Sequence, residues 1–312
     1  MAPSRDPHDE RARAWSDGLR RELAARLGPA VAHAVWVTGS VGRGEAVPGS
    51  DLESLAVVCD PGDPGDPGDP GDPDDRAVRR AVASTDLSRA PWFAETSPAS
   101  AADPRLIRTR AGWSTAADGW AAAPARDLGV VHLGLLADAR PVTDGHGDPE
   151  LLPRLAARSV RTHPAILTDI LADALSTRAS VPSRLTRTLR SDPVVDLKAS
   201  VLTPVVKLAR WAALRVGVTS TSTDGRLELA ADPRVLPADR WDSLRVAARV
   251  TARLRWEVRL RAGSDGPGTD RVPLSVLTTA ERAGLRSAAR EIAGAQRTLD
   301  YLRSSGGLRE PG

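Results

Sequence analysis

Two short segments near the N-terminus carry residue types suited to binding phosphate groups and a metal ion. Residues 39–45 read Gly-Ser-Val-Gly-Arg-Gly-Glu, and residues 50–53 read Ser-Asp-Leu-Glu. Glycines let backbone N–H groups approach a triphosphate, and the N-terminus of a helix favours negative charge. Asp51 and Glu53 stand two residues apart, so on a strand both point to one face and can hold a hard cation. Together the segments are typical of a nucleotidyltransferase.

The elements that must position these residues follow from the hydrophobic pattern. An amphipathic helix is expected over 11–27, and Gly28-Pro29 ends it. Apolar runs predict strands at 31–38 and 54–59, with the Gly-Ser turn between them opening a helix. A further strand is expected at 128–136, because near-continuous apolar residues are typical of a sheet covered on both faces.

The connections between these strands are predicted to differ in character. Repeated Asp-Pro-Gly triplets predict an extended, solvated loop at 60–75, because proline at every third position denies helix and ladder hydrogen bonds. A short helix follows at 76–85, and 86–127 is expected to be irregular with helical turns. Trp113 and Trp120 within that segment are expected to pack in the core, since large aromatic side chains are usually buried.

From residue 149 onward the chain is expected to be almost wholly helical. Periodic Leu, Val and Ala predict a bundle of the four-helix type. The predicted helices cover 149–158, 164–177, 181–190, 197–216, 238–262 and 275–303. The expected fold class is therefore an α/β (α+β) domain with a small mixed sheet over 11–148, followed by an all-α helical-bundle domain over 149–305.

Composition narrows the classes of partner. The 312 residues are 27% charged and 41% hydrophobic with a net charge of only +3, which is too balanced to predict nucleic acid as the partner. The single cysteine, Cys59, excludes an intramolecular disulfide and a cysteine-based zinc cluster. No secretory signal is visible at 1–10, and no apolar run reaches the ~20 residues of a membrane span. A cytoplasmic protein without membrane association is expected.

The glycine segment, 39–45, and the acidic pair resemble a known signature. Gly39-Ser40 with Ser50-Asp51-x-Glu53 is similar to the Gly-Ser…Asp-x-Asp pattern of the DNA polymerase β-like nucleotidyltransferases. Within that superfamily the segment resembles the PII-protein uridylyltransferase and the glutamine-synthetase adenylyltransferase. It is most similar to nucleotidyltransferases found beside CBS domains in bacterial signalling proteins, which carry a helical substrate-binding domain after the catalytic one.

Later landmarks extend this resemblance over roughly residues 12 to 303. Residues 135–142 are similar to the family's strand ending in Asp-x-Arg-Pro-Val, and 195–210 resemble the opening of its helical domain. Thr223-x-x-Arg226-Leu227 and the closing helix that contains Gln296 fit the same pattern.

The resemblance implies metal-dependent transfer of a nucleoside monophosphate from an NTP to a hydroxyl, by analogy on a protein side chain, in signalling or regulation; a small-molecule acceptor stays open. Mg²⁺ or Mn²⁺ would stabilise the attacking and leaving oxygens. Its implied ligands, which are also the catalytic carboxylates, are Asp51, Glu53 and Asp138. The implied nucleotide-binding residues, which would contact phosphate, are Gly39, Ser40, Arg43 and Arg140.

Each of these residues also has a structural interpretation that the sequence leaves open. Asp51 could make a turn, Asp138 could pair with Arg140, and Arg43 could pair with Glu45 at a helix start. Asp196 is expected to cap a helix, and the arginines along 240–261 are expected on a solvated face. Glu53 departs from the family's aspartate, which favours an alternative: a nucleotide-binding regulatory protein without catalysis.

Overall fold

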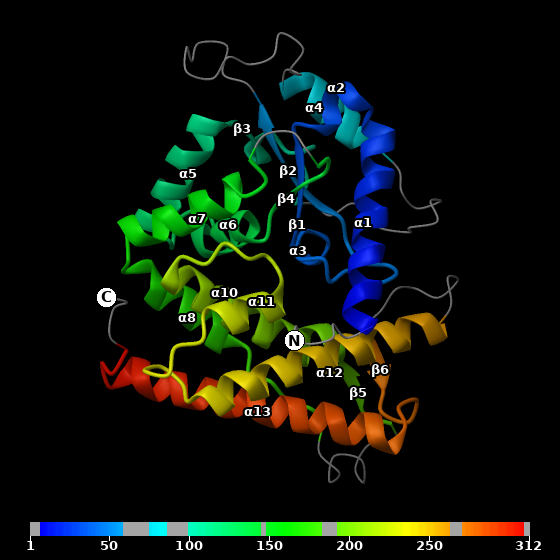
Figure 1. Ribbon diagram of the computed structural model, residues 1–312, viewed down its shortest axis with the longest axis vertical. Helices are drawn as coiled ribbons and strands as arrows, with labels where there is room; N and C mark the ends of the chain where they lie inside the picture. The colour runs from blue at the N-terminus through cyan, green and yellow to red at the C-terminus, as the bar shows by residue number, and fades with distance from the viewer. Residues whose placement is uncertain are drawn as a thin grey trace, which may run out of the picture. The chain divides into compact units, whose positions relative to one another are not determined.

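The computed structural model describes residues 7–58, 75–85, 99–144, 148–182, 192–262 and 270–308 (Figure 1). The predicted loop at 60–75, Cys59 and nearly all of the predicted helix at 181–190 lie outside these residues. The chain divides into two compact units, residues 1–163 and 164–312. Among the described residues, no helix combines the length and the apolar character needed to cross a membrane.

A small mixed sheet of four strands lies at the centre of the N-terminal unit, as the sequence predicts. Its order is β3-β2-β1-β4, with β2 and β3 parallel and the other pairs antiparallel. The register sets Thr38 opposite Glu53 and Val37 opposite Arg140. The strands are β1 (Val35–Thr38), β2 (Glu53–Val58), β3 (Ile107–Thr109) and β4 (Arg140–Pro141).

Helices cover this sheet from two sides (Figure 1). Helix α1 runs along one side, where Leu19, Leu23 and Leu27 pack in a core with buried residues of β1 and β2. Helices α5, α6 and α7 gather on the other side. The helices of the unit are α1 (Pro7–Leu27), α2 (Pro29–Ala32), α3 (Gly39–Gly42), α4 (Asp75–Ser84), the 3₁₀ turn η1 (Pro104–Leu106), α5 (Arg110–Ala122), α6 (Gly129–Ala137) and α7 (Leu151–Thr162).

The predicted strand at 128–136 is wrong, because this segment forms helix α6. A continuous apolar run fits a buried helix as well as a buried strand, and periodicity does not separate the two. The close approach of α6 to its neighbours depends on Gly129, since a Cβ there would lie 2.8 Å from the carbonyl oxygen of Trp120. The prediction that 86–127 is irregular is likewise wrong for 107–122, which forms β3 and α5.

Two smaller boundaries also differ from the prediction. Residues 29–32 form the short helix α2, so β1 is limited to Val35–Thr38 of the predicted strand at 31–38. Helix α7, which the sequence assigns to the helical domain, packs against α5 and α6 within the N-terminal unit. The predicted assignment of 11–148 to a nucleotidyltransferase fold stays a prediction.

The C-terminal unit is mainly helical, as predicted, with one small sheet that the sequence does not reveal. Figure 1 shows its two longest helices, α12 and α13, side by side and running in opposite directions. Strands β5 (Val194–Asp196) and β6 (Arg271–Pro273) form an antiparallel pair. The helices are α8 (Ile166–Ser176), the π-helical turn η2 (Lys198–Leu202), α10 (Thr203–Val216), α11 (Thr223–Leu229), α12 (Ala238–Ala262) and α13 (Thr279–Ser304).

Candidate active site

The glycine segment joins two neighbouring strands of the sheet. Strand β1 ends at Thr38, α3 occupies Gly39–Gly42, and the chain returns to β2 at Glu53. The predicted order of strand, Gly-Ser helix start and strand is therefore confirmed. Ser40 lies half-buried in α3, Glu53 is half-buried opposite Thr38, and Asp51 is exposed just before β2.

Gly39 is required for two separate reasons. Its φ of +60° lies in the left-handed region, which residues with a Cβ rarely adopt. A Cβ at this position would also overlap Oε2 of Glu53. The glycine thus lets the Glu53 carboxylate lie directly against the start of α3, and the structure brings these two predicted site residues together.

Gly42 likewise allows a close approach of α3 to the backbone of Asp138. A Cβ on Gly42 would overlap the carbonyl oxygen of Asp138 and lie 2.8 Å from that of Val37. Only glycine lets α3 pack this closely on the end of α6. Thr38 adds a second link, because its Oγ1 donates a 2.5 Å hydrogen bond to the carbonyl oxygen of Leu135.

Arg43 connects two carboxylates across the site. Its Nη1 lies 2.5 Å from Oδ2 of Asp138, and its Nε lies 2.9 Å from Oε2 of Glu45. Burial lowers the pKa of Arg43, but the charges of Asp138 and Glu45 outweigh burial and leave it raised. The predicted pairing of Arg43 with Glu45 is confirmed.

Asp138 is fully buried at the C-terminal end of α6, not on the strand that the sequence suggests. Asp138 forms an ion pair with Arg43, whereas Arg140 pairs with Asp17 of α1 at 3.0 Å. The suggested pairing of Asp138 with Arg140 is therefore not the one in the structure. A fully buried aspartate with a charged partner is satisfied where it stands.

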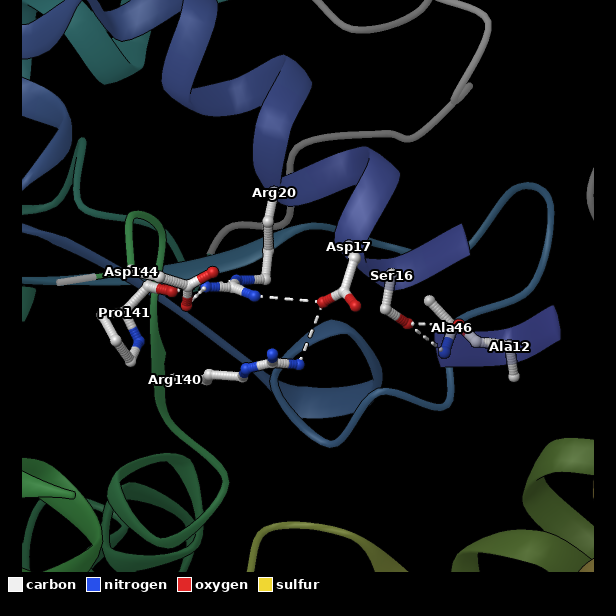
Figure 2. Close-up of polar contacts among 8 residues, drawn as sticks. All are labelled: Ala12, Ser16, Asp17, Arg20, Ala46, Arg140, Pro141 and Asp144. Atoms are coloured by element: carbon white, nitrogen blue, oxygen red, sulfur yellow. Dashed lines mark hydrogen bonds and ion pairs between the residues drawn. The ribbon is translucent and has the colours of Figure 1, made fainter. Parts of the chain in front are cut away.

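Arg140 belongs to a cluster of two arginines and two aspartates that joins α1 to β4 (Figure 2). Asp17 Oδ1 lies 3.0 Å from Nη1 of Arg140 and accepts a 3.0 Å hydrogen bond from Nη1 of Arg20. Arg20 also donates from Nε to the carbonyl oxygen of Pro141 at 2.9 Å and from Nη2 to Asp144 at 2.7 Å. Burial and then the charge of Arg20 lower the pKa of Arg140.

Helix α1 therefore has a polar face toward the site that sequence reasoning missed. The Oγ of Ser16 accepts a 3.1 Å hydrogen bond from the backbone N–H of Ala46, just after the glycine segment. Gly44, with φ +72°, lies against the side chain of Arg13. Residues 13, 16, 17 and 20 have the i, i+3, i+4, i+7 spacing of one helix face. That spacing is the signal that could have identified them.

The predicted metal ligands fit a cation only in part. Asp51 and Glu53 supply the carboxylate oxygens that Mg²⁺ prefers, and Mg²⁺ commonly uses one or two carboxylates with substrate phosphates. Asp138 does not join them as a third ligand, because Arg43 holds its carboxylate. Among the described residues, no three His, Cys, Asp or Glu side chains form a group that could hold a metal ion.

Trp113 and Trp120 are buried, which confirms the core-packing interpretation. Trp113 is fully buried and its Nε1–H donates a 2.8 Å hydrogen bond to the carbonyl oxygen of Ala56 in β2. The Trp120 ring stacks on His132 with ring centroids 4.6 Å apart, so the histidine packs on α6 and not on a strand. The guanidinium of Arg108 lies over both tryptophan rings.

Comparison with known protein families finds a match within the C-terminal unit. Residues 166–302 match the family model described as "Putative nucleotidyltransferase substrate binding domain". These residues are similar to that domain family. The match supports the predicted nucleotidyltransferase resemblance, and it runs from the first residue of α8 nearly to the end of α13. No curated protein matches the chain.

Several sequence landmarks of the C-terminal unit have structural roles. Gln296 is fully buried, donates to the carbonyl oxygens of Ala174 and Thr177, and accepts from the N–H of Ala179. It thereby holds the end of α8 against α13. Asp196 accepts a 2.7 Å hydrogen bond from the N–H of Ala199, so the expected capping role is confirmed.

Buried arginines also stabilise the C-terminal unit. Asp270 accepts from Arg255 at 2.7 Å and from Arg259 at 3.3 Å, and both arginines of α12 are buried. The expectation that the arginines along 240–261 lie on a solvated face is wrong for these two. Helical spacing of four residues puts them on one face, and the partner that allows their burial comes from outside the helix.

Proposed function

We propose that this chain is a nucleotidyltransferase that moves a nucleoside monophosphate from an NTP to a hydroxyl group. The observation that carries the proposal is the combination of two features in one chain. The C-terminal unit is similar to a domain family named for nucleotidyltransferase substrate binding, and the N-terminal unit folds its Gly-Ser helix start directly against the Glu53 carboxylate.

The chain's own residues would divide the work as follows. Ser40 and the backbone around Gly39 would contact the phosphates, and Arg43 and Arg140 would add charge-assisted hydrogen bonds to phosphate oxygens. Asp51 and Glu53 would hold Mg²⁺ or Mn²⁺ together with those oxygens, and the metal would stabilise charge on the transferring phosphoryl group. Asp138 would act after exchanging Arg43 for another partner, because the pair in the structure occupies its carboxylate.

The acceptor proposed is a hydroxyl on a protein side chain, in signalling or regulation within the cytoplasm. The support is the analogy with uridylyl- and adenylyltransferases that modify proteins, together with the family of the C-terminal unit. That unit would present the acceptor, while the N-terminal unit would present the NTP.

A second candidate, nucleotide binding without transfer, is favoured by two observations at the same site. Arg43 neutralises the fully buried Asp138, which removes the third carboxylate from the ligand set. Glu53 stands where the resembling family has aspartate, and its extra methylene moves a bound metal by on the order of an ångström, enough to slow catalysis.

Calorimetric titration tests nucleotide binding. Each of the four NTPs is titrated with Mg²⁺ and then Mn²⁺ into the wild type, Asp51→Ala and the matched control Glu10→Ala, which removes an exposed carboxylate from α1. Metal-dependent binding that only Asp51→Ala abolishes supports the site. Absence of binding in the wild type under both metals contradicts both candidate functions.

Transfer is tested with α-labelled NTP and a cell extract as the source of acceptor. Label incorporation by the wild type that Asp51→Ala abolishes supports the transferase. If the wild type binds NTP without incorporation, Glu53→Asp separates the candidates. A large gain in incorporation identifies a weakened transferase, and unchanged binding without incorporation identifies the binding protein.

A further inference from the structure

The inference concerns how α1 holds Arg140, and it rests on the proposed function. Arg140 lies on β4 opposite Val37, and β1 leads from Val37 directly into Gly39 and Ser40. Its side chain is 34% exposed, so an anion from solvent can reach it. Arginine stays charged at neutral pH even where burial lowers its pKa.

Both ends of Arg140 are held from α1. The Nη1 of its guanidinium lies 3.0 Å from Asp17 Oδ1, and Arg20 donates to the carbonyl oxygen of the next residue, Pro141. Figure 2 shows the guanidinium groups of Arg20 and Arg140 converging on the same Asp17 oxygen. Arg20 is itself 3% exposed and is also bonded to Asp144. Arg20 therefore holds Asp17 in place, and Asp17 in turn holds Arg140.

We propose that Asp17 is a positioning residue, which orients the Arg140 guanidinium to receive a phosphate group of the NTP. The Asp17 carboxylate pairs with Nη1 of the guanidinium and fixes the orientation of that group. The rest of the guanidinium can then bind a second, anionic partner. Asp17 does not itself contact the nucleotide. Holding a long side chain in its binding rotamer removes part of the entropy cost of ordering it on binding.

The sign of the change in anion affinity separates positioning from simple charge. Removing the negative charge of Asp17 makes the site more positive, so electrostatics alone predicts tighter binding of a polyanion. Loss of positioning predicts weaker binding. Asp144 gives a matched control, because it is also an aspartate bonded to Arg20 and its charge also acts on Arg140, but the ion pair of Arg140 is with Asp17 and not with Asp144.

The experiment titrates inorganic tripolyphosphate and, in parallel, the NTP that the wild type binds. The proteins are full-length wild type, Asp17→Ala, Asp17→Asn, Asp144→Ala, Arg140→Gln and the double variant Asp17→Ala/Arg140→Gln. We expect Asp17→Ala to bind tripolyphosphate about tenfold more weakly, the effect of one lost charge-assisted hydrogen bond. Asp17→Asn keeps an acceptor oxygen and should lose less, whereas Asp144→Ala should bind as tightly as the wild type or more tightly.

The coupling between Asp17 and Arg140 in the affinity for tripolyphosphate separates positioning from a purely structural role, which would give no such coupling. The double variant should bind no more weakly than Arg140→Gln alone, because Asp17 acts only through Arg140. Thermal unfolding of each variant checks that it is folded. If Asp17→Ala is not folded, Asp17→Asn takes its place in the comparison.

Unchanged or tighter binding by both Asp17 variants overturns the proposal, as does unchanged binding by Arg140→Gln. If the wild type binds neither NTP nor tripolyphosphate, the proposed function fails and the positioning role falls with it. That outcome differs from a wild type that binds while the Asp17 variants bind equally well.

Discussion

Gly42→Ala tests whether the glycine segment works by letting α3 pack on the end of α6. The added Cβ would overlap the carbonyl oxygen of Asp138 and stand 2.8 Å from that of Val37. Both are backbone atoms of regular elements, so neither can move aside as a flexible side chain would. Overpacking usually costs roughly 1–3 kcal/mol, and two rigid neighbours point to the upper end, about 3 kcal/mol. At roughly 2–4 °C per kcal/mol, the N-terminal unit should melt about 6–12 °C lower.

Calorimetry of the full chain, with hydrogen exchange to assign each transition to a unit, measures this change. Gly119→Ala is the matched control, because it sits within α5 and, apart from its chain neighbours and the nearby backbone of α5, no described atom lies within 4 Å of its Cβ position. It should stabilise by about 0.5–1 kcal/mol, the usual gain from alanine within a helix. Protection at 129–142 should fall in Gly42→Ala and not in Gly119→Ala. Equal melting of the two variants would refute the packing argument.

Two further predictions concern the C-terminal unit. Hydrogen bonds from Arg234 and then Arg215 lower the pKa of Asp232, so its stabilisation is complete above its unfolded pKa near 4 and is lost as the pH falls toward the folded pKa. Asp232→Asn should therefore destabilise the domain more at pH 6 than at pH 2, and equal losses in thermal unfolding at both pH values would contradict this. Gln296→Leu should cost about 3 kcal/mol, because it leaves buried backbone groups without partners. Arg297→Leu, an exposed change on the same helix, should cost little, and similar melting temperatures for the two variants would rule the explanation out.

The part of the fold that the sequence predicts well is the part with strong local signals. Alternation between a short apolar run, a Gly-Ser turn and a second apolar run predicts β1, α3 and β2 in the correct order. Long periodic segments predict α12 and α13, and the observed α12, Ala238–Ala262, has the predicted bounds. These signals are local, since each depends on residues within one element and its caps.

Elements whose state depends on distant neighbours are not predictable in this way. Helix α6 reads as a strand because its apolar run is uniform, and its helical state depends on packing against α5 and α7. Strands β5 and β6 contain three residues each and pair across most of the C-terminal unit. Such short strands exist only through their partner, so the local sequence carries little trace of them.

The candidate site shows the same division between local and distant information. Proximity of Gly39 to Glu53 follows from two strands that the sequence predicts and that pair antiparallel in the structure. The ion-pair partner of Asp138 does not follow from the sequence. The nearest arginine in sequence, Arg140, pairs with Asp17, whereas Arg43, which is distant in sequence, pairs with Asp138. Sequence spacing favours the partner that is nearest along the chain, whereas the fold decides which side chains point toward one another.

The glycine segment connects these observations, because its glycines first of all allow close packing. Gly39 admits the Glu53 carboxylate, Gly42 admits the Asp138 backbone, and Arg43 then reaches the Asp138 carboxylate. Glu53, Asp138 and Arg43, which are implied in catalysis or nucleotide binding, can thus come together because Gly39 and Gly42 have no side chains. Replacing either glycine should therefore separate Glu53 or Asp138 from α3 and disable the site through geometry, even where every polar group is still present.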